Sequence, residues 1–508
     1  MVNKNLVYSF FSKKAILFLL SSAILAFIVS LWHRYAYIDD CWFGEQAYWL
    51  EKTGYVKTET IQAGLGWEHR LFVYHKLSIW IGALIVHFAG WSIYYFKTFT
   101  LIIYFLFFIF LNYYQKTNKS WFTTDHLLLS CLLIFTNPLM FIYAFTYRPE
   151  ILVMFFGFIT YWTLEHSRNG VSKQFLWASL AGIASGLAFL SHLNGIIFGV
   201  SGFLFLLIYK KYRLIPVFSI SAILVAVFYF IDMLQAGNLE SFLQQMKNWP
   251  DAVSGNYFSG DSMIISILRK MGNEHQRFFW SPKAAAFSTL FFLSVIFSFR
   301  YLKEKYRSIL IYTGLLIASL NLLGSQIAER YIIYYLPMMA LIIAISVRQI
   351  IHRKQIAKLT FLVLIFVIQL GFLSKYWVEI MNMNSDFPAT NHELSGYIPE
   401  GNHKLLAPYH YIYNEMGRNP LLTYQSLEKY EMAMHKLLSG HQALLRCKKL
   451  GVEYIIVDKD LADEDDKYRW FEPAINGSDP NYGVFKKHKG FIILSTLKPY
   501  LSEPPVAN

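Results

Sequence analysis

The amino-acid sequence predicts a polytopic α-helical membrane protein that carries a small α/β domain at its C-terminal end. Hydrophobic residues make up 55% of its 508 residues and charged residues only 16%, whereas soluble domains carry about 25% charged residues. The mean hydropathy is +0.35. The formal net charge of +13 could suggest a nucleic-acid partner. However, the basic residues lie in short clusters between apolar runs, which is how membrane topology signals are distributed, so we expect no nucleic acid.

The apolar runs reach or approach the length of ~20 residues with which a helix crosses a bilayer. They predict about eleven transmembrane helices, at residues 15–32, 92–111, 125–145, 150–164, 175–190, 195–209, 214–232, 285–299, 308–325, 330–347 and 357–377. The first run follows Lys13 and Lys14, but no small-residue cleavage site comes after it, so we expect a retained anchor. The shorter run Leu77–Ala89 predicts a helix that lies at the membrane interface.

Charge in the connections predicts the orientation of these helices. With the N-terminus in the cytoplasm, every inner connection is basic, as the positive-inside rule requires. The inner residues would be Lys116, Lys119, Arg168, Lys173, Lys210, Lys211, Arg213, Arg300, Lys303, Lys305, Arg307, Arg348, Arg353, Lys354 and Lys358. The outer segment 34–76 instead mixes five Lys or Arg with six Asp or Glu. A bacterial cytoplasmic (inner) membrane, crossed many times, is the expected location.

An odd number of spans places the C-terminal segment outside the membrane, and the composition shift of this segment predicts a second domain. Residues 1–379 would form the transmembrane domain, with outer loops at 33–91 and 233–284. Residues 380–508 would form an extracytoplasmic, or periplasmic, α/β domain. In this tail a helical pattern over Glu428–Leu450 leads into a β-branched strand at Gly451–Asp458, and Tyr482–Phe485 with Gly490–Thr496 predicts a hairpin. Cys41, Cys131 and Cys447 have no metal-ligand spacing.

Ionisable residues gather at the outer ends of the apolar runs, where polar groups tend to mark a pathway or a site. The candidates are Asp39, Asp40, Glu68, His69, Arg70, Lys97, Arg148, Glu150, His192, Glu329, Arg330 and Tyr331. Each has a purely structural alternative. Asp39 and Asp40 could cap a helix, Pro149 could form a tight turn, and Lys97 could extend to the interface. As a set on one side of the membrane, they predict a single outward-facing cavity.

Carboxylates beside cations and aromatic rings suit the transfer of a polar group from an anionic lipid. The cations would hold a phosphate by charge-assisted hydrogen bonds. A carboxylate, with Asp39 and Asp40 as the catalytic candidates, would orient or deprotonate an attacking hydroxyl. The same acidic pair also suits a divalent metal, which the sequence leaves open.

Several stretches, in order along residues 15–380, resemble the C-superfold (GT-C) glycosyltransferases. The similarity is greatest to the group of protein O-mannosyltransferases and lipid A aminoarabinose transferases. The matching stretches are Ile38–Tyr48 with its acidic pair, Glu68–Arg70 before the interfacial helix, Phe88–Lys97, Thr146–Glu150, Gly186–His192 and Glu329–Pro337. Asp40 stands where the family has Glu, and His69-Arg70 stands where it has Lys-Pro.

The resemblance implies an inverting transferase that uses a polyprenyl-phosphate sugar, with a lipid, glycan or protein hydroxyl as the acceptor. Asp39 would be the general base. Arg330, His69, Arg70 and Lys97 would stabilise the phosphate charge, and Glu150 with Arg148 would support the site or contact the sugar. Two other function classes remain. A transporter or flippase of lipid-linked sugars would need charged or broken helices at mid-membrane, and a scaffold protein would leave the acidic and basic outer residues without a purpose.

Overall fold

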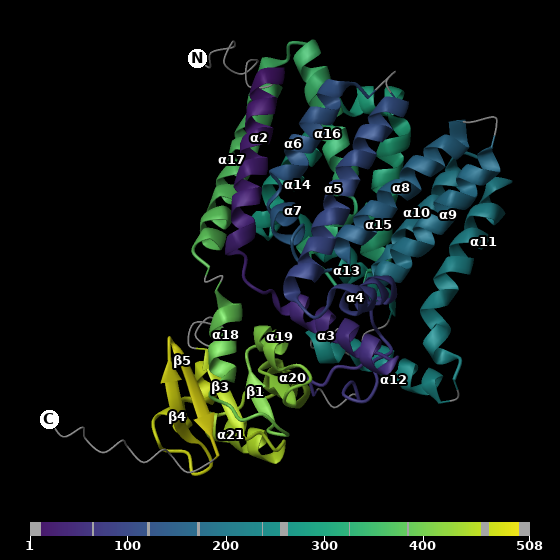
Figure 1. Ribbon diagram of the computed structural model, residues 1–508. Coiled ribbons are helices and arrows are strands. Elements are labelled where there is room, and N and C mark those ends of the chain that lie inside the picture. Colours follow the sequence, from purple (N-terminus) through teal and green to yellow (C-terminus); the bar gives the residue numbers. More distant parts are fainter. Residues whose placement is uncertain are drawn as a thin grey trace.

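The computed structural model describes residues 12–62, 66–118, 122–169, 173–235, 237–254, 263–324, 326–383, 386–458 and 467–496. A helical bundle occupies one end of the molecule and a mixed α/β domain the other, with short helices between them (Figure 1). This arrangement confirms the predicted fold class. Lys119, part of the expected loop 233–284 (residues 236 and 255–262) and the last twelve residues of the tail fall outside the described residues.

The bundle consists of helices that match the predicted runs. They are α2 (Lys13–Ser30), α5 (Ile93–Thr117), α6 (Thr124–Phe135), α7 (Pro138–Tyr143), α8 (Glu150–Asn169), α9 (Gln174–Ser191), α10 (Ile196–Ile208), α11 (Leu214–Ala226), α14 (Pro282–Lys305), α15 (Arg307–Leu323), α16 (Leu336–His352) and α17 (Ile356–Met381). Short 3-10 helices extend some of them: η1 (Leu31–His33), η2 (Leu193–Gly195), η3 (Val227–Met233) and η4 (Glu329–Tyr334).

Six of these helices, among the described residues, are long and apolar enough to cross a membrane: α2 with η1, α5, α9, α11 with η3, α14 and α17. The other predicted spans are shorter or more polar helices. The central helix α16 is shorter than a typical membrane span, yet most of its side chains are buried within the bundle. A helix enclosed by its neighbours does not need a full apolar span of its own.

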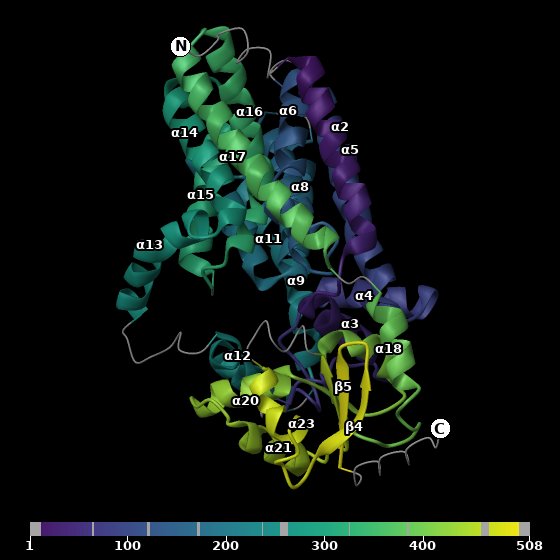
Figure 2. The same ribbon diagram turned by 90° about the vertical axis from the view of Figure 1, so that its left-hand side faces the viewer.

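Four helices lie between the bundle and the domain, or beside them: α3 (Ile38–Thr53), α4 (Lys76–Ala89), α12 (Asn238–Ser254) and α13 (Met263–Phe279) (Figures 1 and 2). Helix α4 covers the predicted interfacial run. Helix α3 ends at Gly54, whose φ of 77° lies in the left-handed region that glycine adopts at low cost.

The α/β domain contains a five-stranded sheet with the order β2-β1-β3-β5-β4. Its elements are α18 (Phe387–Ser395), β1 (Leu405–Ala407), η5 (Tyr409–Tyr411), α19 (Ile412–Glu415), β2 (Leu421–Thr423), α20 (Gln425–Met434), α21 (Gly440–Lys449), β3 (Tyr454–Asp458), η6 (Tyr468–Trp470), α23 (Glu472–Ile475), β4 (Gly483–His488) and β5 (Phe491–Ser495). Strand β1 is parallel to β2 and β3, whereas β5 is antiparallel to β3 and β4. The hairpin and the strand after a helix were both predicted. The single helical pattern at 428–450 is two helices, because His435 adopts a left-handed conformation (φ 49°) between them.

The sheet is buried on both faces, and this explains why β3 is apolar at every position from Tyr454 to Val457. Ile455 and Val457 pack with the domain's own helices. Tyr454 and Ile456 pack on the other face, in a core that also contains Ala36, Cys41 and Ile93 from the membrane part. Alternate residues of a strand point to opposite faces, so a doubly covered strand loses the polar alternation of an exposed one.

Helix α3 is fixed to the bundle through its first turn. The buried Asp40 carboxylate accepts hydrogen bonds from the Tyr37 and Tyr147 amides and lies 3.2 Å from Lys97 Nζ in α5. Lys97 also donates to the Tyr35 carbonyl at 2.7 Å. Each buried charge therefore has a counter-charge and hydrogen bonds, the condition under which burial is tolerated.

We expect Asp40→Asn to destabilise the protein strongly, because it leaves the Lys97 ammonium buried without a counter-charge. Breaking one partner of a buried pair costs about 3–5 kcal/mol. A thermal unfolding midpoint measured in detergent should fall clearly for Asp40→Asn. It should fall much less for the neighbouring Asp39→Asn, since the Asp39 side chain is 17% exposed. Equal midpoints for the two variants would contradict the structural role of Asp40.

The predicted orientation can be measured with two matched cysteine variants. Glu472 is exposed in the α/β domain and Glu304 is exposed near the far end of α14. In intact cells whose outer surface is accessible, a membrane-impermeant maleimide should label Glu472→Cys. It should label Glu304→Cys only after permeabilisation. The opposite pattern would reverse the predicted topology.

Candidate active site

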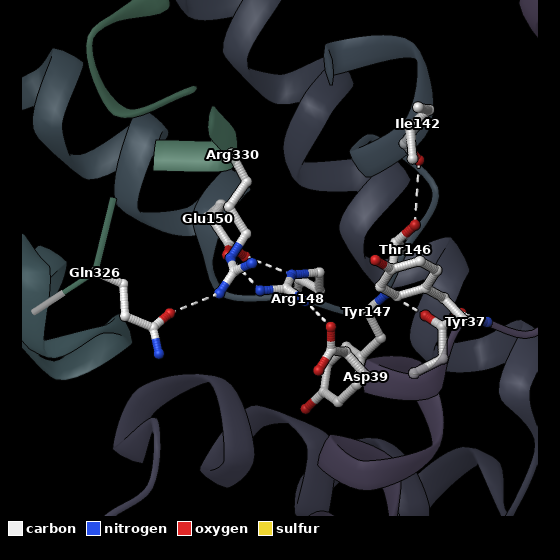
Figure 3. A network of polar contacts seen from close by, with 10 residues as sticks. Tyr37, Asp39, Ile142, Thr146, Tyr147, Arg148, Glu150, Gln326 and Arg330 are labelled. Carbon is white, nitrogen blue, oxygen red and sulfur yellow. Dashed lines mark hydrogen bonds and ion pairs between the residues drawn. The ribbon is translucent and has the colours of Figure 1, made fainter. Parts of the chain in front are cut away.

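Asp39 lies in the first turn of α3, the helix between the bundle and the α/β domain (Figure 1), and its side chain points toward Arg148 (Figure 3). Its carboxylate forms an ion pair with the Arg148 guanidinium. Unlike its fully buried neighbour Asp40, Asp39 keeps part of its side chain exposed. It is therefore the carboxylate of the pair that a substrate can reach.

Arg148 lies between α7 and α8, and it bridges two carboxylates. Besides Asp39 it contacts Glu150, the first residue of α8, through two parallel hydrogen bonds of 3.0 Å and 2.7 Å. Such a fork holds the plane of the guanidinium, and thereby its third nitrogen, in one orientation. Glu150 is fully buried. Within the Arg148-Pro149-Glu150 turn, Glu150 thus fixes Arg148, and Arg148 in turn fixes the orientation of the Asp39 carboxylate.

Arg330, in η4, closes the cluster on the side opposite Asp39 (Figure 3). Its Nε lies 3.5 Å from Glu150 Oε1, and its Nη2 donates to Gln326 Oε1 at 3.2 Å. The guanidinium lies 5.1 Å from the centre of the Tyr331 ring. Within the described part of the chain its Nε has no hydrogen-bond partner, and the side chain is 30% exposed. Arg330 is therefore a partly exposed cation that the described residues hold by contacts of 3.2 Å and longer.

Two histidines form one wall beside this cluster. The rings of His75 and His192 stack at 4.4 Å, and His192 also contacts Tyr331 and Tyr334. Burial lowers the pKa of His75 to about 4 and holds the pKa of His192 well below its usual range. Both imidazoles are neutral at physiological pH and present flat, polar surfaces rather than charges.

The next residue, Lys76, is buried at the start of α4. Its ammonium lies 2.6 Å from Asp232 Oδ2 in η3 and 3.5 Å from the centre of the Tyr74 ring. Burial lowers the pKa of Lys76 to about 8. The sequence analysis did not select His75 or Lys76. The available signal was two basic residue types directly before an apolar helix that has no other charge except His87.

The structure places other predicted site residues differently. Asp40 and Lys97 pair with each other and with backbone groups, and these contacts hold the start of α3 in place. Tyr331 packs under Arg330, and Glu329 begins η4 beside it.

Glu68, His69 and Arg70 do not join the Asp39 cluster. Arg70 contacts Gln235 at 3.2 Å and lies over Tyr55 and Phe72. His69 faces two polar cavities of about 560 and 460 Å³, one beside the α/β domain and one beside α12. The sequence prediction selected them for their position before the interfacial helix. Five residues separate Arg70 from Lys76, the first residue of that helix, and the residues that reach the cluster are the ones next to it.

The residues at the acidic pair do not fit a metal. Asp39 faces a guanidinium and Asp40 faces an ammonium, so the two carboxylates do not converge on one point. Among the residues that the structure describes, no three His, Cys, Asp or Glu side chains are grouped as metal ligands.

Comparisons with known proteins agree on the fold. No protein-family model matches the chain, and no curated protein matches it by sequence. Solved structures do match over nearly the full length. ArnT from Cupriavidus metallidurans bound to undecaprenyl phosphate aligns with a TM-score of 0.60 and 11% identity, covering 96% of this chain and 99% of that one. ArnT in the apo state gives 0.57 and 9%, covering 95% and 98%.

An archaeal protein shares the architecture over a smaller part of its own length. The oligosaccharyltransferase of Archaeoglobus fulgidus, tethered to an acceptor peptide, aligns with a TM-score of 0.51 and 14% identity, covering 95% of this chain and 74% of that one. At such low identity the likeness concerns the fold. The chain has the fold of the GT-C membrane glycosyltransferases.

Proposed function

We propose that this protein is an inverting glycosyltransferase that moves a monosaccharide from a polyprenyl-phosphate donor to an acceptor hydroxyl at the outer face of a bacterial cell membrane. The observation that carries the proposal is the pairing of two groups across one site. Asp39 is a partly exposed carboxylate that Arg148 holds in a fixed orientation, and Arg330 is a partly exposed cation with only long contacts to Glu150 and Gln326. The GT-C fold around them supports the assignment, as does the ArnT structure with bound undecaprenyl phosphate.

In the proposed reaction the acceptor hydroxyl binds at Asp39, which accepts its proton as the oxygen attacks the anomeric carbon. The new bond from the acceptor oxygen to this carbon forms as the bond from the carbon to the phosphate oxygen breaks. The lipid phosphate leaves with the electron pair, and Arg330 stabilises its negative charge. A single displacement inverts the configuration at the anomeric carbon.

The two guanidiniums of the cluster are held unequally, and this leaves one of them available for an anionic donor. Two carboxylates, Asp39 and Glu150, balance the two guanidiniums of Arg148 and Arg330. Arg148 is held on both sides, whereas Arg330 makes only long contacts. An incoming phosphate can therefore recruit Arg330 without removing the partner that orients Asp39. The neutral His75 and His192 pair adds a flat surface against which a sugar ring can pack.

A groove in the bundle suits the prenyl chain of such a donor. It has a volume of about 620 Å³ and lies between α9, α10 and α11 with η3. Almost all of its lining is apolar. Gly182 and Gly186 let α11 approach α9 closely, because a Cβ at either position would collide with α11. Gly199 of α10 leaves the groove open.

The groove ends near the polar cluster. Phe189, which lines it, lies one turn before His192, and Phe230 lines it from η3. Tyr229, next to Phe230, lies 5.2 Å from the Lys76 ammonium. A lipid phosphate at the cluster could therefore extend its chain directly into apolar surroundings, where each buried CH₂ contributes about 0.8 kcal/mol.

Asp39→Asn should abolish transfer while the protein still folds and inserts, because the amide cannot accept the proton. General-base catalysis contributes about 10²–10⁴-fold. The measurement supplies wild type and variant with a panel of radiolabelled polyprenyl-phosphate sugars and follows the label into lipid, glycan and protein fractions. The labelled fraction identifies the acceptor class.

Asp125→Asn is the matched control, since Asp125 lies at the start of α6, pairs with Arg348 and is 45% exposed. This variant should keep the wild-type rate. Full activity in Asp39→Asn would refute the proposed mechanism. If no donor supports transfer but reconstituted vesicles translocate a lipid-linked sugar, the transporter function replaces the enzyme.

Gly199→Phe should fill the groove and weaken the binding of long-chain donors. We expect the KM for a C55 donor to rise about tenfold, as displacement of a few buried CH₂ groups implies, while a short-chain donor analogue keeps its KM. Gly371→Phe, on α17 with open space around its Cα, serves as the control and should change neither value. An equal rise for both chain lengths would place the prenyl chain elsewhere.

A further inference from the structure

The α/β domain contacts the helix that carries Asp39 at two separate places. The first is Tyr413 in α19, whose hydroxyl donates a 2.7 Å hydrogen bond to the main-chain carbonyl of Asp40. That carbonyl belongs to the first turn of α3, one residue from Asp39. The domain therefore reaches the backbone next to the proposed base.

Two residues of the membrane part, Gly44 and Trp91, make room for the Tyr413 side chain and hold it in place. A Cβ at Gly44, one turn along α3, would lie 2.4 Å from this oxygen, so only glycine leaves room for it. The Tyr413 ring stacks on Trp91 at 4.5 Å with an interplanar angle of 25°, and the Trp91 indole donates to the Ile412 carbonyl. Trp91 lies between α4 and α5, so the phenol is held by the membrane part on two sides.

The second contact runs through Glu45, which is buried in the middle of α3. Its carboxylate accepts hydrogen bonds from the Thr58 hydroxyl, the Glu59 amide, and both the amide and hydroxyl of Thr60. Burial raises the pKa of Glu45, and these bonds act against that shift. A carboxylate with four donors fixes the segment 58–60 firmly to α3.

The same segment is bound to the α/β domain. The Thr60 carbonyl accepts hydrogen bonds from the Thr423 amide at 2.8 Å, the Thr423 hydroxyl at 3.0 Å and the Ser426 hydroxyl at 2.9 Å. Thr423 ends β2, and Ser426 lies in the first turn of α20. Helix α3 is thus connected to the sheet domain at its first turn by Tyr413 and at its middle through Glu45 and Thr60.

We propose that the α/β domain positions the catalytic carboxylate, with Tyr413 as the positioning residue. It sets the place of the first turn of α3 and hence of Asp39 relative to Arg148 and Arg330. This role rests on the proposed function, and it makes the domain a part of the active site rather than an attached binding module. It acts on the rate of the chemical step, because Tyr413 bonds to the helix that carries Asp39 and is not among the described residues that line the donor groove.

The test compares Tyr413→Phe with Tyr482→Phe. Both remove a hydroxyl that donates to a main-chain carbonyl at 2.7 Å, but the partner of Tyr482 is Val452, inside the α/β domain. Tyr413→Phe keeps the ring and its stack on Trp91. We expect its kcat to fall about 10- to 100-fold, as a misplacement of about 1 Å causes, with the donor KM within about twofold. Tyr482→Phe should keep the wild-type kcat at a similar thermal stability.

A second readout does not depend on activity. Cys41 follows Asp40 in α3 and is 2% exposed. In a background with Cys131→Ser and Cys447→Ala, a maleimide should label Cys41 about tenfold faster in Tyr413→Phe than in Tyr482→Phe, as loosening of the first turn by the net worth of one hydrogen bond implies. Equal labelling rates, or equal loss of kcat in both variants, would overturn the proposal. If Cys41 is labelled faster in Tyr413→Phe but the wild type transfers no sugar, Tyr413 still positions α3 and the proposed function fails.

Discussion

The site depends on one guanidinium that two carboxylates share. Arg148 forms a fork with the buried Glu150, and this fork leaves a single direction for its remaining donor, toward Asp39. A buried carboxylate and a buried guanidinium are each costly alone, and their mutual pairing is what makes the arrangement stable. The two carboxylates around Arg148 also have different roles. Glu150 satisfies the charge of Arg148 inside the bundle, which lets Asp39 remain at the surface of the site.

The two adjacent aspartates pair with different cations, Asp39 with Arg148 and Asp40 with Lys97. Asp39 and Asp40 are neighbours in the sequence, yet one faces the site and the other the interior. Successive residues of a helix point about 100° apart, so a helix start at a membrane boundary can place one carboxylate in each environment. The interior carboxylate fixes the helix, and the other pairs with Arg148 at the partly exposed edge of the cluster. An acidic pair at such a boundary need not indicate a metal.

Composition and apolar runs were enough to predict the fold class, the helices of the bundle and the hairpin of the tail. The contribution of Asp39, Arg148, Glu150 and Arg330 to one cluster also followed from their shared position at one end of the runs. The sequence could not show that Asp40 and Lys97 are saturated, since pairing depends on side-chain directions. It also could not show that Glu68–Arg70 lie apart from the Asp39 cluster, because a position before a helix says little about which residue reaches inward. The hydrogen bond from Tyr413 to the Asp40 carbonyl joins residues 373 positions apart and ends on a backbone atom. Since every residue has such a carbonyl, the amino-acid sequence could not predict this bond.

The doubly buried sheet has a consequence for how the molecule is built. One face of β3 and β5 packs against residues that flank α3, so part of the core beneath the active-site helix comes from strands that are synthesised more than 350 residues later. Helix α3 is synthesised early, yet its surroundings are completed only after the last strands have reached the same side. During biogenesis the bundle can assemble while the site remains unformed. Under the proposed function, a chain gains the ability to transfer a sugar only after its C-terminal strands have folded against α3.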